Sequence, residues 1–345
     1  SQKSLKCVRK SCLHFSWLFP KISKMCQKKL FTLLVTFPKK KIKKCVKKIY
    51  LHFSWFFSKK SNFPQNIYDN IFQNIEYVKT LDFNVYSIFV FDNCNDHTEY
   101  LLNSYKNMNK NNNVIIKKII NDAPQRTVRI AKARNECLNI VYNELKDISF
   151  HIMIDSDDKG AVKWNIDTID RYLNNFDNDD WDCISFNRTQ HDPPHPAYFD
   201  IWALLYDDFK HHCFGYGPEQ RKTKHVLTAM RAGLFTKLKN TKGNSTDVIS
   251  AFNGFAIYKT DRFKGFYYDG LIENFKKLIT DTERDGSVKA FKKYFNLDVF
   301  WDDGWNLDEP IPDDQYPGQV CEHLFYHISA HKAGRKIKVS KYIIM

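Results

Sequence analysis

The chain has 345 residues, of which 43% are hydrophobic and 27% are charged, as in an ordinary globular protein. With only 12 Gly and 11 Pro it is neither collagen-like nor dominated by linkers, and no apolar run approaches the roughly 18 residues of a conventional transmembrane helix. The net charge of +14 arises at the N-terminus, because residues 1–60 hold 17 Lys and Arg and no acid. Residues 61–345 carry 36 basic and 39 acidic residues, so they lack the basic footprint of a nucleic-acid-binding domain, and no nucleic-acid partner is expected.

Residues 1–45 are predicted to be a basic, Lys-rich extension outside the folded domain. A short sequence at residues 7–17 recurs at 45–55, but two copies are too few for a repeat protein. Short apolar runs between lysines suit either peripheral contact with an anionic membrane surface or a solvated extension without a role. We expect residues 46–345 to form one folded domain, with halves at 46–180 and 181–345.

The nine cysteines include no CxxC pair. Their spacing therefore indicates neither a zinc finger nor a dense disulfide scaffold. Reduced thiols are typical of a cytoplasmic protein. We expect a cytoplasmic location, with peripheral contact at a membrane surface as an open alternative.

Taken in chain order, the first half alternates between apolar runs of strand length and segments with apolar residues at helical spacing. Residues 85–91 are a continuous apolar run, as expected for a buried parallel strand. The predicted strands are 50–57, 85–91, 114–120 and 150–154, and the predicted helices between them are 66–80, 99–106 and 128–144. This alternation predicts an α/β fold with a mostly parallel sheet flanked by helices.

The second half is less regular. The pattern predicts strands at 180–186, 248–258 and 336–344, and a helix at 321–333. Residues 207–247 read as a loop with a basic middle, and residues 281–319 as an acidic, turn-rich segment.

Acidic residues directly follow two of the predicted strands. Asp92 opens a polar loop after residues 85–91, and Asp155, Asp157 and Asp158 follow residues 150–154. In parallel sheets, ligands bind beyond the carboxyl ends of the strands, and Mg²⁺ or Mn²⁺ prefers carboxylate oxygens. Such a metal can neutralise a diphosphate leaving group as the bond to it breaks. The alternative is a strand-to-helix turn whose acids cap the next helix.

Basic residues in the preceding predicted helix supply a partner for a phosphate. Arg129 and Arg134 stand five residues apart, with Lys132 between them. The planar guanidinium of Arg donates twice to one phosphate. In isolation, either Arg would equally suit a solvated helix face.

The order of these segments resembles that of nucleotide-sugar glycosyltransferases of the GT-A fold. In that family an acidic loop after a strand is followed by Ala-Arg-Asn and then by Asp-x-Asp-Asp, which match residues 92–98, 133–135 and 155–158. Residues 322–334 are similar to the family's acceptor-side helix, and residues 253–258 to the Gly-Phe segment before it. Residues 198–204 and 321–323 look closest to polysaccharide-building members in large DNA viruses and microbes.

The resemblance implies a Rossmann-type GT-A domain that uses Mn²⁺ or Mg²⁺. Residues 46–180 would bind a nucleotide-sugar donor, and residues 181–345 a saccharide or glycan acceptor. The implied donor-binding residues are Asp92, Arg129, Arg134, Asp155 and Asp158, and the implied metal ligands are Asp155 and Asp157.

One departure from the family pattern concerns the catalytic base. The family has two adjacent acids at the start of the acceptor-side helix, whereas this chain has Glu322 and His323. A carboxylate or a neutral histidine could each accept the proton of the acceptor hydroxyl, so the base is either of the two. His327 lies one helical turn after His323, and either packing or completion of the metal shell would suit it.

The sequence thus predicts a metal-dependent hexosyl- or pentosyltransferase, with inversion or retention left open. A metal-dependent nucleotidyltransferase would also use paired acids, but the family resemblance of residues 322–334 disfavours it. A basic protein that docks on membrane or nucleic acid through residues 1–60 is the alternative from another class.

Overall fold

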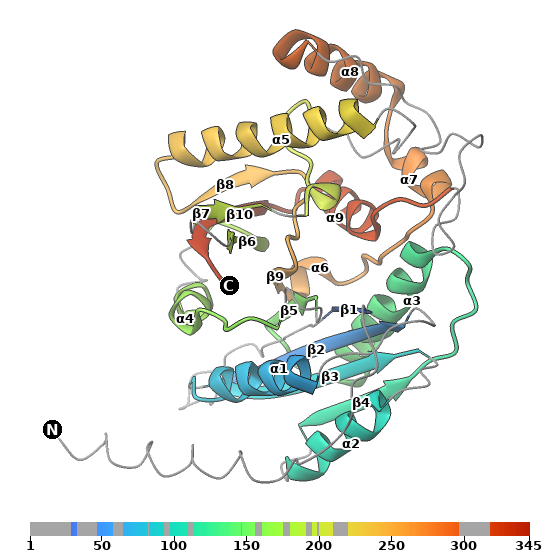
Figure 1. Ribbon diagram of the computed structural model, residues 1–345, viewed down its shortest axis with the longest axis vertical. Coiled ribbons are helices and arrows are strands. Elements are labelled where there is room, and N and C mark those ends of the chain that lie inside the picture. The colour runs from blue at the N-terminus through green and yellow to red at the C-terminus, as the bar shows by residue number, and fades with distance from the viewer. Residues whose placement is uncertain are drawn as a thin grey trace, which may run out of the picture.

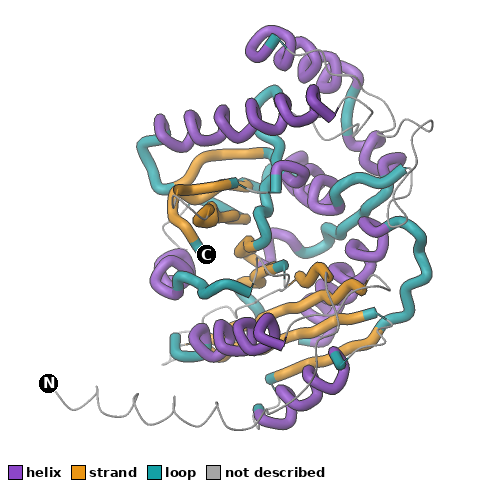
Figure 2. Tube along the Cα trace, in the orientation of Figure 1, coloured by secondary structure: helices purple, strands orange, loops and turns teal. Residues whose placement is uncertain are grey.

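The computed structural model describes residues 29–32, 47–57, 65–81, 83–92, 97–109, 113–145, 147–155, 161–174, 180–190, 195–198, 200–209, 220–296 and 318–345. Most of the predicted extension at 1–45 lies outside these ranges. The chain forms a mixed α/β fold in which helices pack around one sheet (Figure 1). Helix and strand segments alternate along the first half of the chain (Figure 2).

One side of the sheet is parallel, as the sequence predicts. Its strands lie in the order β4 (Val114–Lys118), β3 (Phe83–Phe91), β2 (Lys47–Phe57) and β5 (Phe150–Ile154), and each pair of neighbours is parallel. The chain passes outward from β2 to β3 and β4 and then returns to place β5 on the other side of β2. The carboxyl ends of β2 and β5 therefore flank the point at which the strand order reverses.

The other side of the sheet is mixed. β9 (Phe255–Lys259) lies antiparallel between β5 and β6 (Cys183–Gln190). β10 (Ile337–Ile343) is parallel to β6 and antiparallel to β8 (Ser245–Val248). β1 (Lys29–Thr32) and β7 (His195–Ala197) pair antiparallel with β2 and β6.

The expectation of a mostly parallel sheet therefore holds for β4, β3, β2 and β5, whereas among the described strands on the other side only β6 and β10 form a parallel pair. The chain enters β9 at the carboxyl edge of β5, through a turn at Asn253 and Gly254. Both residues have positive φ, 53° and 81°, and glycine adopts this conformation without strain. After that turn the chain runs back along β5 as β9.

The three helices predicted in the first half lie close to their predicted positions. They are α1 (Gln65–Val78), α2 (Thr98–Met108) and α3 (Arg126–Asn139), which continues into a π-helical turn at Ile140–Glu144. A fourth helix, α4 (Ile166–Asn174), was not predicted. The second half contains α5 (Gln220–Asn240), α6 (Thr260–Phe263), α7 (Ile272–Leu278), α8 (Asp281–Phe295) and α9 (Glu322–Lys332).

Two of these helices, α5 and α8, contradict the sequence predictions. α5 replaces most of the predicted loop at 207–247, because a narrow stripe of Met230, Leu234 and Leu238 is buried within an otherwise basic segment. α8 occupies part of the predicted turn-rich segment. A capping box at Thr280 and Glu283 fixes its start, since each side chain satisfies a backbone N–H of the other residue.

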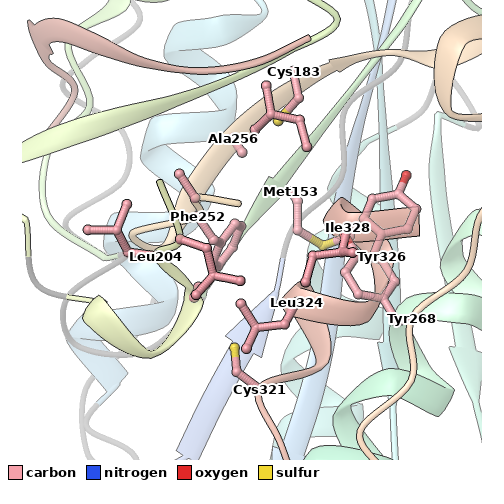
Figure 3. Packing of buried hydrophobic residues seen from close by; sticks show 14 of the residues in the cluster. Met153, Cys183, Leu204, Phe252, Ala256, Tyr268, Cys321, Leu324, Tyr326 and Ile328 are labelled. Atoms are coloured by element: carbon pink, nitrogen blue, oxygen red, sulfur yellow. The ribbon is translucent and has the colours of Figure 1, made fainter. Parts of the chain in front are cut away.

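The core lies on both faces of the sheet. Alternate residues of β3 point to opposite faces, so Ile88 and Val90 pack with α3 and α9, while Phe89 and Phe91 pack with α1 and α2. Figure 3 shows part of the core on the face of α3 and α9. Side chains from β5, β9, α9 and the loop before β9 pack together there, among them Met153, Ala256, Leu324 and Phe252. Within the described ranges, no helix has the length and apolar character needed to cross a membrane.

Candidate functional site

A buried arginine joins three segments that the sequence places far apart. Nη2 of Arg134 on α3 donates to Oδ1 of Asp155 at 3.0 Å, and its Nη1 lies 2.5 Å from Oε1 of Glu322. Nη1 also contacts Nε2 of His323. Arg134 is 1% exposed, and the side chains of Asp155 and Glu322 are 13% and 5% exposed. We call Arg134, Asp155, Glu322 and His323 the Arg134 cluster.

Local packing holds the guanidinium of Arg134 in place. Its Cζ lies 4.9 Å from the ring centre of Phe252 and 5.4 Å from that of Tyr268, within the range of cation–π attraction. Burial alone would lower the pKa of Arg134, but the carboxylates of Glu322 and Asp155 outweigh burial and raise the pKa. Arg134 is therefore fixed in its charged form.

Asp155 is positioned by the turn that opens β9. Its backbone N–H donates to the carbonyl of Gly254 at 2.8 Å. The guanidinium of Arg188 lies against Gly254, so a Cβ at this position would overlap it. Nε of Arg188 donates to the carbonyl of Asn253 at 2.7 Å. Glycine is required here both for its backbone conformation and for the close approach of Arg188.

Asp92 occupies the corresponding position after β3. It is 7% exposed and lies at the same edge of the sheet as Asp155, with β2 between the two strands. The next helix, α2, begins at Thr98, whose hydroxyl lies 2.8 Å from that of Tyr68. The predicted donor contact of Asp92 stays a prediction.

Arg129 lies apart from the Arg134 cluster. Its Nη1 donates to the carbonyls of Ala123 and Pro124, both at 3.3 Å, just before α3. Its own carbonyl accepts from Asn121 at 2.9 Å. Of the two predicted phosphate-binding arginines, the structure therefore brings only Arg134 to Asp155.

His323 is buried against Phe252, with ring centres 3.7 Å apart. Burial lowers the pKa of His323 well below its ordinary value, and the charge of Arg134 and the neighbouring His327 lower it further. The neutral ring accepts from Arg134 through Nε2, which leaves the proton on Nδ1. The nitrogen that could accept a proton therefore faces a cation.

His327 is fully buried and both of its ring nitrogens are hydrogen-bonded. Nδ1 lies 3.0 Å from the hydroxyl of Ser250, and Nε2 lies 2.9 Å from that of Tyr258. Since Ser250 donates to the carbonyl of Ala203, Nδ1 donates to Ser250 and Nε2 accepts from Tyr258. Burial, and then Arg134, lower the pKa of His327 to about 3. In this arrangement neither nitrogen is available to a metal ion.

The remaining predicted metal and donor residues, Asp157 and Asp158, lie outside the described residues. Within the described ranges, no group of three or more His, Cys, Asp or Glu side chains is arranged to hold a metal ion. Asp155 is therefore the one predicted metal ligand, besides His327, whose position is described.

Asp200 was missed by the sequence analysis, although it lies in the segment 198–204 noted for its resemblance. Its backbone N–H donates to Oδ1 of Asn253 at 3.0 Å, and its side chain accepts from the N–H of Ala203 at 3.3 Å. Burial, and then the charges of Asp155 and Glu322, raise the pKa of Asp200 to about 7. It is thus a third carboxyl at the Arg134 cluster, held by the turn that also holds Asp155.

Arg188 was also missed, because nothing in its sequence surroundings marks it as a site residue. Only the pairing of β6 with β9 brings it to Gly254. Comparison with known proteins adds no assignment, since no protein-family model and no curated protein matches the chain.

Proposed function

We propose that the protein is a metal-dependent glycosyltransferase of GT-A type, which moves a sugar from a nucleoside-diphosphate donor to a hydroxyl of a saccharide or glycan. The observation that supports this most directly is the contact of Arg134 with both Asp155 and Glu322. These residues come from three of the sequence segments that resemble the family. A site that binds donor and acceptor together would require these segments to lie close to one another.

The position of the Arg134 cluster in the sheet supports a ligand site. Asp155 follows β5 at the place where the strand order reverses next to β2, and open α/β sheets bind ligands at such places. Asp92 follows β3 at the same edge. A nucleotide sugar bound there would lie across the carboxyl ends of β3, β2 and β5.

The charges in the site suit a divalent cation. Arg134 offsets one negative charge, whereas Asp155, Glu322 and an ionised Asp200 supply three. Hard carboxylate oxygens are the ligands of Mg²⁺ and Mn²⁺. Asp155 and Asp157 would hold the metal, which when bound neutralises charge on the diphosphate.

In the proposed transfer, the oxygen of an acceptor hydroxyl bonds to C1 of the donor sugar, and the bond from C1 to the diphosphate oxygen breaks. The electron pair of the broken bond stays on the diphosphate, and the hydroxyl proton passes to a base. Glu322 is paired with Arg134, and Nε2 of His323 faces Arg134. We propose Asp200 as this base, because within the described part of the chain no cationic side chain forms an ion pair with its carboxyl. In the metal-free protein, burial and the charges of Asp155 and Glu322 raise its pKa to about 7, toward the range in which general bases work best.

Donor turnover tests the proposal. The full chain is incubated with UDP-, GDP- and TDP-sugars and Mn²⁺, and release of the nucleoside diphosphate is measured. We expect release from one donor, lost with chelator and with Asp157→Ala. Asp247→Ala is the matched control, because Asp247 is exposed on β8 at the far end of the sheet, and it should keep the wild-type rate. A folded wild-type protein that turns over no donor would contradict the proposal.

A further inference from the structure

Arg188 is a buried cation that contacts no acidic side chain among the residues that the structure describes. It is 8% exposed, and the one hydrogen bond that fixes it runs from Nε to the backbone carbonyl of Asn253. In the part of the chain that the structure describes, no carboxylate lies within ion-pair distance of Arg188. Charged side chains are rarely buried unless they are paired, so this guanidinium has capacity for a further anion.

The other deeply buried arginine shows the contrast. Arg134 is 1% exposed and touches two carboxylates. Arg188 is almost as well enclosed, yet its neighbours are a backbone carbonyl and a glycine. Within the described residues, the fold thus supplies carboxylates to Arg134 and none to Arg188.

Arg188 also lies at the functional edge of the sheet. It belongs to the carboxyl-terminal half of β6, and β6 and β5 both run antiparallel to β9. Their carboxyl ends therefore share one edge. The guanidinium of Arg188 packs against Gly254, and the carbonyl of Gly254 accepts a hydrogen bond from the backbone N–H of Asp155.

From this placement we infer that Arg188 is an anion-binding residue, which contacts a phosphate group of the diphosphate in the bound donor. The inference rests on the proposed function. The planar guanidinium can donate two parallel hydrogen bonds to phosphate oxygens, and such bonds are stronger where water is largely excluded. As the bond between C1 and the diphosphate oxygen breaks, the charge that develops on the leaving oxygens faces this fixed cation. No proton moves to or from Arg188.

Binding, without turnover, is the test. UDP, GDP, TDP and inorganic pyrophosphate are titrated by calorimetry into the full chain with Mg²⁺ in excess, and the matching nucleosides are titrated in parallel. We expect Arg188→Gln to weaken binding of the diphosphates and pyrophosphate by tenfold or more, and Arg188→Lys to weaken it less because the charge remains. Nucleoside binding should be the same in both variants as in wild type.

Arg171→Gln is the control, because Arg171 is exposed on α4 and stacks on Tyr342. It should bind every probe as wild type does. Circular dichroism and a thermal melt confirm that each variant is folded. If Arg188→Gln does not fold, the affinities of Arg188→Lys and wild type for the diphosphates and pyrophosphate are compared over a salt series.

The outcomes separate this inference from the transferase proposal. Wild type that binds neither a nucleoside diphosphate nor pyrophosphate would overturn the role of Arg188. Equal affinities for wild type and Arg188→Gln would overturn it as well, even where a donor is turned over. Loss of pyrophosphate binding in Arg188→Gln, in a protein that turns over no donor, would support the phosphate site and count against the transferase.

Discussion

Asp155 and Gly254 are joined by a backbone hydrogen bond of 2.8 Å, from the N–H of Asp155 to the carbonyl of Gly254. The bond continues the antiparallel pairing of β5 with β9 by one residue beyond Ile154 and Phe255. It fixes the backbone of the carboxylate that contacts Arg134. The position of Asp155 therefore depends on a turn almost 100 residues away in the chain.

Replacement of Gly254 by alanine should disturb this arrangement. A Cβ would overlap the guanidinium of Arg188, and φ is +81°, a conformation that costs a non-glycine residue about 1–3 kcal/mol. We expect Gly254→Ala to lower the free energy of unfolding in urea by at least about 1 kcal/mol. Gly243→Ala is the control, because no atom lies within 4 Å of a Cβ there, and it should change stability by less than about 0.5 kcal/mol. Equal stabilities for the two variants would contradict the strained turn.

Removal of the charge of Arg134 should be costly. Arg134→Met leaves the carboxylates of Asp155 and Glu322 buried beside each other without a cation, and breaking a buried pair typically costs about 3–5 kcal/mol. The double variant Arg134→Met/Glu322→Leu should recover part of this loss, because one of the unpaired charges is then absent. Urea unfolding of Arg134→Met, Glu322→Leu and the double variant measures the coupling. Additive losses would show that Arg134 and Glu322 do not stabilise each other.

Asp200 should make the free energy of unfolding depend on pH. Its pKa in the folded protein, about 7, lies above the ordinary value of 3.8, so the folded state binds more protons between these values. This group therefore favours folding at low pH, and its contribution is lost as pH rises through 7. Asp200→Asn keeps an oxygen to accept from Ala203 but cannot ionise. Relative to wild type, the variant should gain stability from pH 5 to pH 8 in metal-free urea unfolding, whereas a constant difference would contradict the raised pKa.

The same substitution should alter the pH dependence of the reaction. A base must be ionised to accept a proton, so the wild-type turnover number should rise as pH passes the pKa of Asp200 and then level off. Because the charge of a bound metal ion favours the ionised carboxylate, this rise should lie below the pH of about 7 at which Asp200 ionises in the metal-free protein. Asp200→Asn should lower it by about 10²–10⁴-fold and abolish the rise. Asp247→Asn, on the far edge of the sheet, should keep the wild-type profile. Asp200 would not be the base if its variant stayed within threefold of wild type and kept the rise.

Substitution of His327 distinguishes a structural role of this side chain from a role as a metal ligand. His327→Leu removes hydrogen bonds to Ser250 and Tyr258, and leaving such buried groups unpaired costs about 1–3 kcal/mol each. We expect lower stability with unchanged affinity for Mn²⁺ by calorimetry, in contrast to a lost metal ligand. His331→Ala, at the exposed end of the same helix, should change neither quantity. A tenfold loss of Mn²⁺ affinity in a folded His327 variant would restore the metal role.

The first half of the fold was predictable because its signals are local. Continuous apolar runs identified β3 and β5, and helical spacing identified α1 and α3. α5 was missed because its buried stripe is narrow within a basic segment. The reversed direction of β9 could not be predicted, since it depends on which strand the 253–254 turn meets.

The candidate site was only partly predictable for a related reason. Sequence order identified Arg134, Asp155 and Glu322, because each lies in a recognisable local motif. Asp200 and Arg188 lie in no such motif. Their positions in the site follow from long-range hydrogen bonds with Asn253. The resemblance implies a donor contact for both Arg129 and Arg134, but a sequence motif does not show which side chain of a helix meets the next strand.

The contact between Arg134 and Glu322 has a consequence for synthesis of the protein. The ribosome adds 187 further residues after Arg134 before it reaches Glu322, so a nascent chain that has already formed β9 and the turn at Asn253 and Gly254 still lacks the carboxylate of Glu322. Closing such a distant contact is slow compared with local folding. The charge balance of the site is completed only when α9 docks, and a fragment that ends before α9 should therefore be inactive even where its own strands and helices have formed.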